Sequence, residues 1–236
     1  DPKWKGKVCI RSGQHPYNTA MVASMIAHDG AEATEKWLRG VKANLARKAA
    51  GGDRDVARDI LGGICDIGLA NAYYVGQMKN AAEGTDNRKW GDAIKVVRPT
   101  FANEKSGGTH VNVSGAAVAA HAPNKANAIK LLDFLVSEPA QALYAQANYE
   151  YPVRKGVKLD PVIASFGELK VDPLPLTEIA KYHGAVSIHF VRRLYSNFVS
   201  FRFVFISVHL SIGHWSSPRG LPRGGRVRRP QGGRAV

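Results

Sequence analysis

The sequence predicts an α/β fold with a largely parallel sheet, and three observations favour this class. Two short runs rich in apolar and β-branched residues, 7–11 and 65–70, are predicted to be strands. Stretches with apolar residues at helical spacing lie between and after them. Strands that alternate with helices along a chain are typical of parallel sheets. The 236 residues suffice for one large or two small domains.

The elements of the first part of the chain follow from apolar periodicity and from capping residues. Asp53, after two glycines, is predicted to be a helix N-cap, and Asn71 is predicted to cap the helix that follows the second strand. The predicted elements, in order, are the strand 7–11, the helices 18–27 and 31–43, a weakly extended segment 45–49, the helix 53–61 and the strand 65–70.

The later part of the chain carries fewer clear signals. A helix is predicted to start at Pro123-Asn124, and Ser137 is predicted to cap another helix that ends near Asn148. Two strands are predicted at 94–97 and 111–113, followed by an extended piece at 149–153 and a proline-punctuated, loop-rich segment to residue 181.

The charge of the chain is unevenly distributed. A formal net charge of +14 suggests nucleic acid or an anionic membrane as partner. However, residues 182–236 hold nine Arg and no Lys, Asp or Glu, so most of the basicity lies in this tail. The tail, with an apolar stretch at 199–208 and an Arg-, Gly- and Pro-rich end, resembles translation in a shifted reading frame. A basic nucleic-acid-binding arm is the competing interpretation.

The apolar runs and the first residues of the chain bear on whether the protein is exported. No apolar run reaches the length of a membrane-spanning helix, and the chain does not open with a signal peptide. If the protein is exported, we expect its beginning to have been lost or processed away.

Cys9 and Cys65 match no zinc pattern, so they are either two buried thiols or a disulfide. A disulfide requires neighbouring strands and an oxidising compartment.

Tyrosines follow the two predicted strands. Tyr73 and Tyr74 lie where the second strand turns into a helix, and Tyr17 lies in the loop after the first strand. Ligands of open parallel sheets bind beyond the carboxyl ends of the strands, so we expect these loops to face one cleft. The start of the helix at Gly52 and Asp53 has free N–H groups that favour an anion.

Three phenols in one cleft indicate a metal site of a particular kind. A phenol has a pKa of about 10, so a strong Lewis acid is needed to ionise it at neutral pH. Ferric iron fits such oxygen donors better than calcium, which favours carboxylates and carbonyls, or zinc, which favours Cys and His. Taken alone, however, a tyrosine pair is more often packed in a core or lines a carbohydrate-type pocket.

The order of four segments carries a family resemblance. They are WKGKVCIRSGQHPYN (4–18), GGDRDVARDILGGICDIGLANAYYVG (51–76), THVNVSGAAVAAHAPNKANAIKLLDFLVS (109–137) and EYPV (150–153). From residue 1 to about 181 the chain resembles periplasmic ferric-iron-binding proteins, the FbpA/FutA-like substrate-binding components of iron(III) ABC transporters. The resemblance implies an α/β, type II periplasmic-binding-protein fold, present as one lobe plus part of the return segment, with the first lobe missing.

The resemblance also implies a set of site residues. The family's tyrosine pair, which ligates Fe³⁺, corresponds to Tyr73 and Tyr74, and the further tyrosine of the FutA-like branch corresponds to Tyr17. Some members add a synergistic anion such as carbonate or phosphate, for which the candidate residues here are Gly52, Asp53, Arg54 and Arg11. From the sequence, Arg11 either neutralises such an anion or makes a surface ion pair. His15, near Tyr17, is interpreted as a solvated loop histidine.

The resemblance sets further expectations. We expect residues 1–107 to form the second lobe, 108–181 the return segment, and 182–236 a tail foreign to the family. The whole protein would be periplasmic and monomeric, would close around Fe³⁺ by a hinge motion, and would deliver it to an inner-membrane ABC permease, with no nucleic acid as partner.

Other functions fit the sequence less well. A binding protein for thiamine or a phosphonate is the first alternative, because related folds carry these ligands. A nucleic-acid-binding protein that acts through the tail is the second. No catalytic motif is present, so the chain is not expected to be an enzyme.

Overall fold

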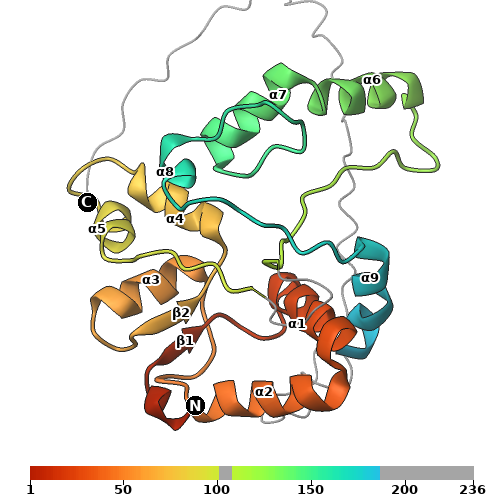
Figure 1. Cartoon of the computed structure of the whole chain (residues 1–236). Helices are drawn as coiled ribbons and strands as arrows, with labels where there is room; N and C mark the ends of the chain where they lie inside the picture. Colours follow the sequence, from red (N-terminus) through yellow and green to blue (C-terminus); the bar gives the residue numbers. More distant parts are fainter. Residues whose placement is uncertain (101–107, 187–236) are drawn as a thin grey trace, which may run out of the picture. The chain divides into compact units, whose positions relative to one another are not determined.

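Two short parallel strands form a sheet in the first part of the chain (Figure 1). The computed structural model describes residues 1–100 and 108–186. Strand β1 (Val8–Ile10) pairs in parallel with β2 (Ile67–Leu69), so that Val8 lies opposite Ile67. Val8 also makes an isolated parallel bridge with Leu45. Among the described residues, this bridge is the one β-type pairing made by the segment 45–49, which was predicted to be extended. Both predicted strands are therefore confirmed in a shortened form.

Four helices follow or connect these strands: α1 (Pro16–Asp29), α2 (Ala31–Ala43), α3 (Asp53–Leu61) and α4 (Ala72–Lys79). Pro16 opens α1 at a position where its missing N–H costs nothing, and the His15 side chain caps the helix by accepting from the Tyr17 N–H. Gly30 separates α1 from α2 with φ 81°, a conformation that favours glycine. The predicted helix at 31–43 has the observed bounds.

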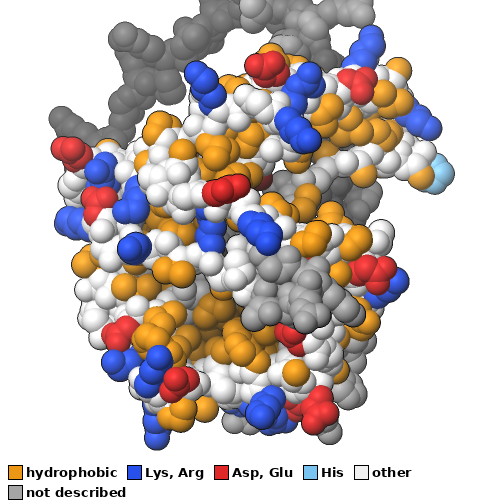
Figure 2. All heavy atoms as spheres, in the orientation of Figure 1, with side chains coloured by type: hydrophobic (Ala, Val, Ile, Leu, Met, Phe, Trp, Pro, Cys, Tyr) orange, Lys and Arg blue, Asp and Glu red, His pale blue; other side chains and the backbone are white. Residues whose placement is uncertain are grey.

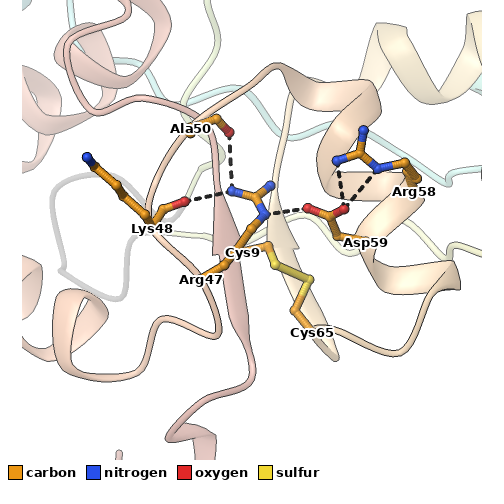
Figure 3. Close-up of a disulfide and its surroundings, with 7 residues drawn as sticks. All are labelled: Cys9, Arg47, Lys48, Ala50, Arg58, Asp59 and Cys65. Atoms are coloured by element: carbon orange, nitrogen blue, oxygen red, sulfur yellow. Dashed lines mark hydrogen bonds and ion pairs between the residues drawn. A yellow bond between two sulfur atoms is a disulfide. The ribbon is translucent and has the colours of Figure 1, made fainter.

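Helix α3 packs directly against both strands (Figure 1). A Cβ on Gly68 of β2 would lie 2.2 Å from Cγ1 of Val56, so only glycine allows this close approach. Below this contact, Val56 packs with Cys9 and Cys65 in a buried cluster. The two cysteines form a disulfide with a Cα–Cα distance of 5.9 Å (Figure 3). Of the two alternatives left by the sequence, the structure has the disulfide.

A buried carboxylate lies beside this disulfide (Figure 3). Asp59 of α3 is 2% exposed and accepts hydrogen bonds from the guanidinium groups of Arg47 and Arg58. Burial raises the pKa of Asp59, but the hydrogen bonds from the two arginines outweigh it, so the pKa lies below its ordinary value. Arg47 also donates to the carbonyls of Lys48 and Ala50 and thereby holds the loop before α3.

The remaining described elements are η1 (Pro2–Trp4), α5 (Asp86–Asp92), α6 (Lys125–Leu135), α7 (Glu138–Leu143), the π-helical turn η2 (Tyr144–Asn148), α8 (Pro161–Ala164) and α9 (Leu176–Ala185). The predicted helix start at Pro123-Asn124 is confirmed, with Asn124 at the N-cap of α6. Ser137 occupies the predicted N-cap position of α7, although its side chain makes no capping hydrogen bond. Helices α5, α8 and α9 were not predicted. Helix α9 packs on α1, and Asp172, just before α9, lies 2.7 Å from Nε2 of His28.

Two predicted strands are wrong. Residues 94–97 alternate between half-buried and exposed, and Ile94 and Val96 pack against the core around Met78. They therefore have the burial pattern of a strand, but within the described residues they join no β-ladder. Residues 111–113 likewise pair with no strand among the residues that the structure describes, and the isolated bridge close to them joins Thr109 to Val171.

Helix α6 has no buried residue, and hydrophobic side chains lie at the surface over α6 and α7 (Figure 2). Among the described helices, none is long and apolar enough to cross a membrane. Helix α9 continues through residue 182, where the tail is predicted to begin. The predicted apolar and Arg-rich parts of the tail, from residue 187 on, lie outside the described residues.

Gly76 lies at the contact between α4 and the end of η2. A Cβ there would lie 2.7 Å from Cβ of Tyr149, which itself has an unusual left-handed φ of 62°. Alanine normally stabilises a helix interior by about 0.5–1 kcal/mol over glycine. Here we expect Gly76→Ala to destabilise the protein by about 1–3 kcal/mol, because overpacking outweighs helix propensity.

Chemical denaturation of Gly76→Ala, compared with Gly40→Ala in α2, tests this expectation. A Cβ on Gly40 meets nothing within 4 Å, so that control should be neutral or slightly stabilising. Equal stability changes in the two variants would contradict the packing described for Gly76.

Candidate metal centre

The three predicted tyrosines lie together at one edge of the sheet. Tyr17 is in the first turn of α1, while Tyr73 and Tyr74 are in the first turn of α4. Both helices start shortly after β1 and β2, whose parallel pairing brings their carboxyl ends to the same edge. The phenol oxygens of Tyr17 and Tyr73 are 3.1 Å apart, and the rings of Tyr73 and Tyr74 stack with centroids 4.2 Å apart.

The Tyr73 phenol is held in its neutral form. Burial is the largest cause that raises the pKa of Tyr73 well above its ordinary value, followed by hydrogen bonds with Tyr17 and Tyr74. Binding of a metal ion to the phenol oxygen requires the loss of this proton. A cation of high charge favours the phenolate form.

This raised pKa has a measurable consequence for the metal-free protein. Because the folded state binds the Tyr73 proton more tightly than the unfolded state, the resulting stability is complete below about pH 10 and is lost as the pH rises further. An ultraviolet phenolate titration should show a late ionisation step. Burial also raises the pKa of Tyr151, so Tyr73→Phe should diminish this step by one tyrosine without removing it. Simultaneous ionisation of all tyrosines would contradict the geometry.

Two arginines lie over the rings of the site. The guanidinium carbon of Arg11 is 5.2 Å from the centroid of Tyr17, and that of Arg54 is 5.0 Å from the centroid of Tyr74. Arg54 is exposed and donates to Gln77, whereas the side chain of Arg11 is only 12% exposed. Nε of Arg11 is buried and has no hydrogen-bond partner. The site is therefore bordered by two positive charges.

Asp53 does not act as predicted at the start of α3. The N-cap is Gly52, and Asp53 is the first helical residue. Its buried carboxylate pairs with Arg11 at 3.0 Å, so the ion pair foreseen for Arg11 is buried and not on the surface. As the first residue of α3, Asp53 has its side chain turned into the protein. The two glycines before it in the sequence give no indication of this direction. The N–H of Gly52 donates to the carboxylate of Asp55 at 2.7 Å.

Two polar residues at the site carry roles that sequence reasoning missed. Asn71 occupies the N-cap position of α4 as predicted, but its side chain makes no capping hydrogen bond and instead donates to Asp53 and accepts from Asn112. His15 packs edge-on against the Tyr17 ring and is half-buried, whereas a solvated histidine was predicted. Burial and then the charge of Arg11 lower its pKa. The described residues contain no cluster of three or more His, Cys, Asp and Glu that could hold a metal.

These features define a ligand-binding protein of the α/β class, with its site at the carboxyl edge of a parallel sheet. The sequence profile described as "Bacterial extracellular solute-binding protein" matches residues 1–165. The chain therefore belongs to this family. Solute-binding proteins are a non-enzymatic class, in agreement with the expectation that the chain is not an enzyme.

Named relatives and solved structures agree with this assignment. The chain is 45% identical over 179 residues to "Iron uptake protein A1" of Synechocystis sp. (strain ATCC 27184 / PCC 6803 / Kazusa), covering 76% of this chain and 49% of that protein. A structure of "Bordetella ferric binding protein" shares 83% identity and a TM-score of 0.76, covering 83% of this chain and 60% of that one. A Trichodesmium protein (IdiA, FutA) "in complex with iron and citrate ligands" shares 38% identity and a TM-score of 0.75, covering 82% and 60%.

The predicted fold class is confirmed by these structures, which are periplasmic binding proteins in part superimposable on this chain. The chain spans about half the length of the curated relatives that it matches.

Proposed function

We propose that the chain binds ferric iron through the phenolate oxygens of Tyr17, Tyr73 and Tyr74. The observation that carries this proposal is the 3.1 Å separation between the phenol oxygens of Tyr17 and Tyr73. Around a small octahedral cation with metal–oxygen distances of about 2.0–2.1 Å, neighbouring ligand oxygens lie roughly 2.9 Å apart. The two phenols therefore need little rearrangement to bind one ion, and Tyr74 is stacked on Tyr73.

The chemistry of the site supports Fe³⁺ over other cations. Its donors are phenols, which suit neither the Cys and His preference of zinc nor the carboxylate preference of calcium. The raised pKa of Tyr73 selects further for a strong Lewis acid. Relatives from Synechocystis, Neisseria and Bordetella are named for iron uptake or for ferric iron binding, which supports the same cargo.

A synergistic anion is proposed to lie beside the iron and to contact Arg11 and Arg54. Their guanidinium groups flank Tyr17 and Tyr74, and the unpartnered Nε of Arg11 is a free donor. Gly52 has its N–H engaged by Asp55, so its contribution depends on a local rearrangement. Carbonate or phosphate offers acceptor oxygens to Nε of Arg11, whose charge is already paired with Asp53, and to the guanidinium of Arg54. A Trichodesmium relative was solved with citrate as well as iron.

The biological role follows from the family. We propose that residues 1–107 and 108–181 correspond to the second lobe and return segment of a periplasmic protein that hands iron to an ABC permease. Solute-binding proteins of this family work with such permeases. This chain covers 60% of the solved Bordetella protein. The remaining part of that relative supports the proposal of a whole protein with two lobes.

Titration with ferric citrate tests the metal assignment. Binding to phenolate is expected to produce a visible phenolate-to-iron charge-transfer band that saturates at one iron per chain. Zinc and calcium should neither produce the band nor prevent its formation. A colourless protein with an unchanged tyrosine spectrum after the addition of ferric citrate would overturn the proposed function for this chain.

A further inference from the structure

The carboxylate of Asp53 joins the two loops that lead into the tyrosine-bearing helices α1 and α4. Its side chain is fully buried. Oδ1 accepts from Nη1 of Arg11 at 3.0 Å, while Oδ2 accepts from the backbone N–H of Asn71 at 3.0 Å and from its side-chain Nδ2 at 2.8 Å. All three interactions reach residues that are distant in sequence, in the loop after β1 and the loop after β2.

Each partner of Asp53 is close to a phenol of the site. Arg11 lies over the ring of Tyr17, and Asn71 is the N-cap of α4, two residues before Tyr73. The loop that holds Arg11 is fixed further by Asn18, whose side-chain amide donates to the carbonyl of Arg11. Movement of either loop away from Asp53 therefore changes the distance between the phenol oxygens of Tyr17 and Tyr73.

The same network reaches the segment that follows residue 108. Oδ1 of Asn71 accepts a 2.8 Å hydrogen bond from Nδ2 of Asn112. A few residues earlier, Thr109 forms the bridge with Val171. A continuous chain of side-chain hydrogen bonds thus runs from Arg11 through Asp53 and Asn71 to Asn112.

We propose that Asp53 is a positioning residue that sets the spacing of the iron-binding phenols, and that it does not itself hold an anion. This inference rests on the proposed function. A carboxylate is suited to the task because every group that faces it is a donor. An amide at this position would turn its NH₂ group toward either Arg11 or Asn71, where two donors would oppose each other. An ionised carboxylate also has no donor with which it could bind an anion directly.

The test compares Asp53→Asn with Asp59→Asn in the full chain. Asp59 is a matched control because it is also buried, on the same helix, and paired with arginines, but its partners are Arg47 and Arg58 instead of the tyrosine loops. Ferric citrate is the probe, iron affinity is measured by competition with free citrate, and thermal unfolding is recorded in parallel.

We expect Asp53→Asn to weaken iron binding by about ten- to hundredfold, as is usual when a group that orients metal ligands is changed. The absorption maximum of the charge-transfer band should shift as well, because the phenolates reorient around the iron. Asp59→Asn should lower the unfolding temperature while the affinity and the band maximum stay those of the wild type.

Two outcomes overturn the inference while leaving the proposed function intact. One is wild-type affinity and band position in Asp53→Asn, and the other is an equal loss in the two variants that follows their loss of stability. A wild-type chain without any band overturns the proposed function and, with it, the inference about Asp53 that rests on that function.

Discussion

Tyr73→Phe is expected to abolish the visible charge-transfer band and to weaken iron binding by more than about a hundredfold. Changes in groups that only orient metal ligands typically cost 10- to 100-fold, and this substitution removes a ligand itself. The ring of Tyr73, which stacks on that of Tyr74, remains in place. The loss of one hydrogen bond with Tyr17 should alter stability by only about 1 kcal/mol.

Spectrophotometric titration with ferric citrate measures this effect, and Tyr74→Phe and Tyr17→Phe should each reduce both the band and the affinity. Tyr144→Phe, in the π-helical turn and outside the site, is the control that should bind iron like the wild type. If Tyr73→Phe retained wild-type affinity, Tyr73 would not be a ligand.

Reduction of the Cys9–Cys65 disulfide is expected to cost about 4 kcal/mol of unfolding free energy, the loop-closure value for a sequence separation of 56 residues. The bond ties β1 to the segment just before β2. Each of these strands leads into a tyrosine-bearing loop, so the reduced protein should also bind iron more weakly. Such a bond persists in oxidising compartments, which fits an extracellular family.

Denaturant unfolding of the oxidised and the reduced wild-type protein measures this difference with the sequence held constant. The double variant Cys9→Ala/Cys65→Ala should have the same free energy of unfolding as the reduced protein, apart from the loss caused by the small cavities that it creates. Equal unfolding midpoints for the oxidised and reduced forms would show that the disulfide does not limit the stability of this chain.

Local patterns in the sequence predicted much of the fold. The helix at 31–43 was found with its observed bounds, since apolar spacing and flanking residues agree there. The N-cap positions of Asn71 and Ser137 and the helix start at Pro123-Asn124 were found for the same reason. The strands at 94–97 and 111–113 were wrong because a β-ladder depends on a distant partner, and periodicity alone does not say whether one is present.

The candidate site likewise contains residues that the sequence predicted and a residue whose contacts it did not predict. The tyrosines were found because they directly follow strands, and the topology of a parallel sheet brings such positions together. The role of Asp53 was not found, because its contacts with Arg11 and Asn71 join residues 42 and 18 positions apart. No local pattern encodes that side chain's inward direction, and a position after two glycines looks like an N-cap from the sequence alone.

The involvement of the phenolates in iron binding is tested most directly by resonance Raman spectroscopy of the iron-loaded chain, with excitation inside the visible band. We predict strongly enhanced tyrosinate ring modes, weakened in Tyr17→Phe and lost in the double variant Tyr73→Phe/Tyr74→Phe. Iron bound to the wild-type chain without any enhanced tyrosinate mode would contradict the account, because the metal would then be held by other groups.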